Sequence, residues 1–61
     1  MNDLLINSVT EILTTAIIDF EYSETEIINL SPEDIFENFG IEISNDELCF
    51  AKNNAIDNTC Y

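Results

Sequence analysis

The chain has 61 residues, of which 13 are Asp or Glu and one is Lys, so its formal net charge is -12 at pH 7. This charge repels nucleic acid, nucleotide phosphates and anionic lipid, so we expect no direct binding to nucleic acid or membrane and a preference for basic proteins. A hydrophobic fraction of 46% is too high for a disordered acidic tail, which indicates one small folded domain.

An apolar stripe with helical spacing runs through the first 20 residues and predicts a long amphipathic helix. The stripe consists of Leu5, Val9, Ile12, Leu13, Ala16, Ile17 and Phe20, and it is widened by Leu4, Ile6 and Ile18. Asn2 or Asp3 can cap its start. The stripe is wider than three short helices can cover, so we expect a homodimer through this first helix.

Three further helix starts share one signature, a serine followed three residues later by an acid, with apolar residues on either side. The pairs are Ser23 with Glu26, Ser31 with Asp34, and Ser44 with Glu47. The second copy also places Pro32 at the first helical position, where proline is preferred. The signature predicts two or three short capped helices.

The ends of these helices are predicted from glycine and from fading apolar patterns. Gly40 should end the second short helix, with Ile35, Phe36 and Phe39 on its inner face. The stretch 41–43 alternates and should be extended.

The third short helix should run from Asn45 to about Lys52 or Asn53 and bury Leu48 together with Phe50 or Ala51. Residues 54–61 have little pattern and are expected to form a flexible polar tail. The predicted fold is therefore all-α, with an acidic helical domain over 1–53, a small bundle, followed by the tail.

Ten acids lie between Asp19 and Glu47, and helix capping explains only part of them. Acids in first turns satisfy backbone amides and favour the helix dipole. Capping does not account for Asp19, Glu21, Glu37 or Glu42. We predict a partner-binding set of these four acids with two neighbours in the same stretch. The set is Asp19, Glu21, Glu37, Glu42, Glu33 and Asp34.

The sequence indicates neither catalysis nor a bound metal or cofactor. Cys49 and Cys60 have no histidine to act as a base, and two cysteines without histidine cannot supply four zinc ligands. A calcium-binding loop starting at Asp19 would have Glu24 and Leu30 where glycine and glutamate are needed. With no secretory signal, the cysteines are expected to be free thiols in the cytoplasm, although pairing through a folded-back tail stays open.

One segment resembles a known family. The run 39–43, Phe-Gly-Ile-Glu-Ile, followed by an acidic helix start, is similar to the segment of acyl carrier proteins between their second and third helices. The resemblance covers about 20 residues and implies a small helical carrier fold. The Asp-Ser-Leu attachment site of that family is missing, because Glu24, Thr25 and Glu26 stand at the corresponding place.

The leading functional hypothesis is a non-catalytic acidic protein that occupies a basic, nucleic-acid-binding surface of a partner. Small acidic inhibitors and DNA mimics of phages have a similar composition. One alternative is a precursor peptide for ribosomal peptide modification, with about residues 1–45 as leader and the tail with Thr59, Cys60 and Tyr61 as substrate. A second alternative is an oligomerising module with the first helix as its interface.

Overall fold

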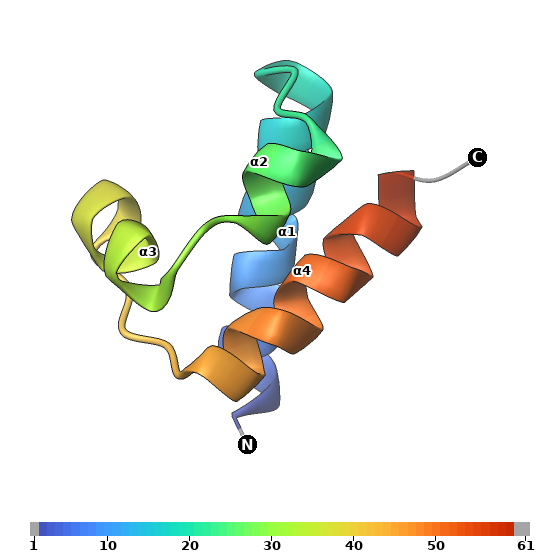
Figure 1. Cartoon of the computed structure of the whole chain (residues 1–61). Coiled ribbons are helices and arrows are strands. Elements are labelled where there is room, and N and C mark those ends of the chain that lie inside the picture. The colour runs from blue at the N-terminus through green and yellow to red at the C-terminus, as the bar shows by residue number, and fades with distance from the viewer. Residues whose placement is uncertain (1, 60–61) are drawn as a thin grey trace.

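The chain folds into helices joined by short loops in the computed structural model, which describes residues 2–59 (Figure 1). In chain order the helices are α1 (Asp3–Asp19), α2 (Glu24–Ile28), α3 (Pro32–Phe39) and α4 (Asn45–Thr59). No strand occurs in these 58 described residues, 2 to 59 inclusive. The predicted all-α fold with one long N-terminal helix is confirmed.

The two longest helices, α1 and α4, pack against each other and form most of the core (Figure 1). Helix α2 also contacts α4, whereas α3 lies to one side of the pair. Every helix contributes to one apolar cluster. Its buried members are Ile6, Val9, Leu13, Ala16, Ile27, Ile35, Ile43, Leu48, Ala51 and Ala55. The small side chains on α4 let α1 approach closely, since the distance between packed helices depends on the side chains at the contact.

The predicted capping boxes are present at α3 and α4. At α3, Asp34 N–H donates to Ser31 Oγ at 3.2 Å, and Ser31 N–H donates to Asp34 Oδ2 at 2.9 Å. At α4, Glu47 N–H donates to Ser44 Oγ at 3.3 Å, and Ser44 N–H donates to Glu47 Oε1 at 3.4 Å. Each pair satisfies backbone donors that a helix start leaves without an internal acceptor.

The remaining helix ends also follow the sequence. Asn2 caps α1 by accepting the Leu5 N–H at 3.1 Å. Ser23 caps α2 by accepting the Glu26 N–H at 3.2 Å. Gly40 ends α3 with φ of 70°, in the left-handed region that favours glycine.

The predicted inner faces of α1 and α3 are partly wrong. Phe20 is 69% exposed, while Ile6, predicted at the edge of the stripe, is buried. On α3 only Ile35 is buried, and Phe36 and Phe39 are 53% and 44% exposed. The physical reason is that α1 packs mainly against α4, while α3 makes few contacts with the other helices, so the aromatic side chains at the end of α1 and on α3 stay uncovered.

The predicted end of the last helix near Lys52 or Asn53 is also wrong, because α4 continues to Thr59. Ala51 and Ala55 are fully buried at helical spacing from Leu48, whereas Phe50 is 49% exposed. The second half of α4 is rich in alanine and asparagine, so its apolar pattern is weak. Packing against α1 stabilises the helix there despite the modest helix propensity of this segment. The rest of the predicted tail, residues 60 and 61, lies outside the described residues.

A contact between distant segments also ties α1 to α4. Glu47 Oε2 accepts the Asn2 N–H at 2.9 Å, while its Oε1 accepts the Ser44 hydroxyl at 2.9 Å. These hydrogen bonds favour the ionised carboxylate, so the backbone N–H of Asn2 and then the Ser44 hydroxyl lower the pKa of Glu47 below its ordinary 4.5.

None of the helices within residues 2–59 is long and apolar enough to cross a membrane.

Replacing Ala55 by glutamate should destabilise the protein, because a charged side chain would enter the fully buried α1–α4 contact. We expect the free energy of unfolding to fall by about 2 kcal/mol or more in urea titrations followed by circular dichroism. Asn54→Glu is the matched control, since Asn54 is exposed and gains the same charge. Equal stability of both variants would show that residues 54–59 do not pack.

The contacts of Glu47 should make stability depend on pH. Because folding lowers its pKa, the stabilisation is complete above the ordinary value of 4.5 and is lost as the pH falls through the lowered pKa of the folded protein. Glu47→Gln should therefore be less stable than the parent at neutral pH and equally stable in strong acid. Unfolding titrations across this range test it, with Glu11→Gln as control for reduced charge repulsion. A stability difference that stays constant with pH would contradict the assignment.

Candidate functional site

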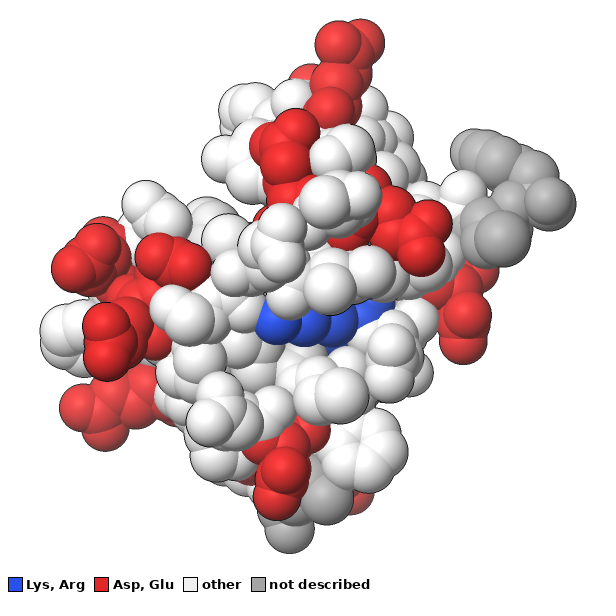
Figure 2. Space-filling model, viewed as in Figure 1, with Lys and Arg blue, Asp and Glu red and all other residues white. Residues whose placement is uncertain are grey.

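Carboxylates gather at separate places on the surface, over α3 and near the turn between α1 and α2 (Figure 2). All six acids predicted to bind a partner belong to these regions. Glu33, Asp34, Glu37 and Glu42 lie on α3 or just after it, whereas Asp19 and Glu21 lie at the end of α1. The structure therefore divides the predicted site into two.

The first group surrounds an exposed aromatic ring. Glu33, Glu37 and Glu42 line a shallow hollow of about 400 Å³ together with Pro32, Phe36 and Ile43. We call these three acids the α3 acidic patch. All three are exposed, and the half-exposed ring of Phe36 lies in the same hollow. The patch thus offers several negative charges beside an apolar surface, which suits arginine or lysine side chains.

Asp34 differs from its neighbours because its carboxylate is already used within the fold. Its Oδ2 accepts the Ser31 N–H at 2.9 Å, and the residue is partly buried. The α3 acidic patch is therefore formed by the other three acids of this region.

Glu21 stands in an unusual backbone conformation at the end of α1. Its φ of 56° is the one positive value among the non-glycine residues between 2 and 59. The N–H groups of Phe20 and Tyr22 both donate to the Ala16 carbonyl at 3.2 Å. In this type of helix end, glycine is preferred at the left-handed position. Phe20 and Tyr22 are the neighbours of this strained residue in the chain. Backbone strain of this kind is often found at functional sites.

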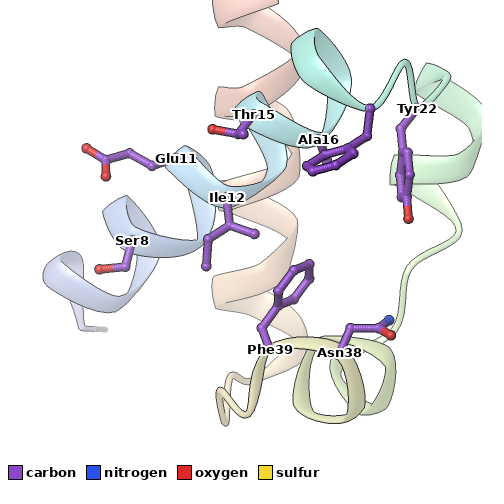
Figure 3. Close-up of a pocket in the computed structure, with 9 residues that line it drawn as sticks. Ser8, Glu11, Ile12, Thr15, Ala16, Tyr22, Asn38 and Phe39 are labelled. Carbon is purple, nitrogen blue, oxygen red and sulfur yellow. The ribbon is translucent and has the colours of Figure 1, made fainter.

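A groove between α1 and α3 is the feature that sequence reasoning missed. It has a volume of about 750 Å³ and is lined by α1, by the following turn and by the end of α3. The Phe39 ring rises from α3 toward Ile12 on α1, and Tyr22 lies at one end (Figure 3). The sequence contains a signal for an open surface here, because the apolar stripe of the first helix is wider than its neighbours can cover. The same pattern predicts that Phe20 and Phe39 are buried, whereas both line the groove.

The single lysine of the chain donates a hydrogen bond to a backbone carbonyl within the fold. Lys52 Nζ donates to the Ile28 carbonyl oxygen at 2.7 Å, and the side chain is half-buried. In Figure 2 its side chain is visible at the surface, with uncharged residues on either side. Ile28 is the last residue of α2, so the ammonium group satisfies a carbonyl at a helix end and favours the helix dipole there.

One of the two cysteines, Cys49, lies within the described residues. Cys49 is exposed on α4, where its Sγ accepts a weak hydrogen bond from Asn53 at 3.9 Å. Cys60 lies outside the described residues. Within residues 2–59 no three metal-ligating side chains are grouped to hold a metal ion. Thr25, which stands where the resemblance to acyl carrier proteins places the attachment serine, is exposed on α2.

No protein-family model, curated protein or solved structure matches the chain.

Glu21→Gly should stabilise the protein, because glycine adopts the left-handed conformation without the steric cost that Glu21 bears. We expect the free energy of unfolding to rise by about 1 kcal/mol, measured by urea titration. Glu21→Gln is the matched control, since it removes the charge and keeps the strain. If glutamine stabilises as much as glycine, charge repulsion and not backbone strain is the cost at this position.

Proposed function

We propose that this protein is a non-catalytic binding protein whose acidic surface occupies a basic, nucleic-acid-binding surface of a partner protein. The observation that carries the proposal is the α3 acidic patch, in which three exposed acids line one hollow together with the half-exposed Phe36. The hydrogen bond of Lys52 supports it, since the one lysine of the chain donates to a backbone carbonyl of its own fold.

The chemistry of such a contact follows from the partner's usual ligand. Duplex DNA presents about one negative charge per 1.7 Å of its axis, and proteins neutralise these charges with Lys and Arg. Carboxylates bind the same side chains through charge-assisted hydrogen bonds, and Arg also stacks on aromatic rings. Glu33, Glu37, Glu42 and Phe36 offer both kinds of contact within one hollow. An inhibitor or DNA mimic of the kind found in phages would act in this way, in the cytoplasm.

The precursor-peptide alternative gains no support from the fold. It requires a C-terminal segment that a modifying enzyme can reach, yet residues 54–59 belong to α4, and Ala55 is fully buried against the core. A homodimer through α1 stays a proposal, supported by the exposure of Leu4 and Ile18 on that helix.

Removing the charge of the α3 acidic patch should weaken capture of the partner. We expect the triple change Glu33→Gln, Glu37→Gln and Glu42→Gln to reduce the amount of basic, DNA-binding protein recovered from a bacterial lysate at low salt. Raising the salt should release the partner from the parent protein, because screening weakens contacts between charges. Duplex DNA added to the lysate should compete.

The matched control removes three exposed acids that lie outside the patch, through Glu24→Gln, Asp46→Asn and Asp57→Asn. This variant has the same net charge as the triple patch variant and should retain the partner. Equal loss in both variants would show that only total charge matters, and a partner that resists both salt and DNA would refute the proposed function.

A further inference from the structure

The groove between α1 and α3 is lined mainly by apolar side chains and is not filled by any described part of the chain. Its apolar lining is Ile12, Ala16, Phe20, Tyr22 and Phe39, and its polar lining is Ser8, Glu11, Thr15 and Asn38. Phe20 is largely exposed there, and Phe39 is close to half-exposed. Aromatic side chains left open to water in this way are typical of surfaces that bind another protein.

We propose that this groove binds an amphipathic basic helix of the partner, with apolar side chains inserted between α1 and α3 and lysine or arginine directed to the rim. The inference rests on the proposed function and adds a second, apolar contact to the α3 acidic patch. Binding of an amphipathic helix with its apolar face in a groove is a common mode of peptide recognition.

The size and shape of the groove fit this occupant. A volume of about 750 Å³ accommodates several side chains and is within the range of about 300–1,000 Å³ typical of ligand pockets. The two walls are helices, and the facing side chains of Ile12 and Phe39 leave an apolar channel between them (Figure 3). Side chains three or four residues apart on one helix face can enter such a channel together.

The charge around the groove selects a cationic occupant. Glu11 lines the groove, and Asp19 and Glu21 lie on either side of Phe20 in the chain. All three acids are exposed. These acids favour a helix rich in Lys and Arg over a second copy of the chain as the occupant of the groove, since a second copy also has a net charge of -12.

The two contacts should respond differently to salt. Attraction between exposed charges is screened within about 10 Å at 0.1 M salt, but the burial of apolar side chains persists at high salt. Groove binding should therefore weaken with salt without disappearing. The salt dependence of binding therefore distinguishes an occupant of the groove from one of the α3 acidic patch.

The test uses a synthetic peptide of about 18 residues made of leucine and lysine, with leucine at the i, i+3, i+4, i+7 positions of one helix face. A scrambled peptide of the same composition is the control, because it has the same charge without the apolar face. In two-dimensional NMR of the 15N-labelled protein, the first peptide should shift the amide signals of Ile12, Thr15, Ala16, Tyr22 and Phe39 at both low and high salt.

Truncation of the groove side chains should weaken peptide binding while leaving the fold intact. Phe39→Ala and Phe20→Ala should each raise the Kd by about tenfold or more, because buried aromatic anchors dominate such interfaces. Phe50→Ala is the matched control, since Phe50 is 49% exposed, lies on α4 and lines a different hollow. Its Kd should stay within about twofold of the parent value, a change of less than about 0.5 kcal/mol. Circular dichroism of each variant verifies the fold.

Several outcomes would overturn the proposal. Equal shifts with the scrambled peptide would mean that charge alone is recognised, and an unchanged Kd for Phe39→Ala and Phe20→Ala would mean that the groove is not the site. A dimer in sedimentation equilibrium that Phe39→Ala dissociates would assign the groove to a second copy instead. None of these results affects lysate capture by the α3 acidic patch, so the groove can fail while the proposed function stands.

Discussion

The contact between α1 and α4 is the interaction on which the rest of the structure depends. It joins the two ends of the sequence and contains most of the buried side chains. A domain of about 60 residues buries only about 60% of the surface that its unfolded chain exposes, less than larger domains bury, and so has little stability to lose. The small side chains of Ala16, Ala51 and Ala55 are therefore important, because they let α1 and α4 approach closely and exclude water from a small apolar core. The shorter helices α2 and α3 add Ile27 and Ile35 to a core that these two helices define.

The helix starts could be predicted from the sequence because they depend on local chemistry. A serine and an acid three residues apart determine their own hydrogen bonds, so Ser31 with Asp34 and Ser44 with Glu47 were found without any knowledge of the fold. The faces of the helices depend on which other helix covers them. The exposure of Phe20 and Phe39, and the burial of Ala55, follow from the packing of α1 against α4, which apolar periodicity alone does not specify.

The same distinction applies to the candidate site. The sequence identified the acids that capping does not use, and three of the predicted six, Glu33, Glu37 and Glu42, line one hollow. It could not show that Asp19 and Glu21 lie apart from them, or that Glu21 adopts a left-handed conformation. The environment of Lys52 was equally hidden, since a contact with Ile28 spans 24 residues of the chain. The sequence of a single chain contains no pattern that predicts a contact between residues so far apart.

The weak attachment of α3 has a consequence for how the two surfaces act together. Within α3, Ile35 is the one buried residue, so opening this helix should require less free energy than unfolding α1 and α4. The groove and the α3 acidic patch both need α3 in place, because each is lined by its side chains. A molecule that holds α3 at one surface therefore also prepares the other. Occupants of the two surfaces would then favour each other's binding by the same factor, even though they never touch.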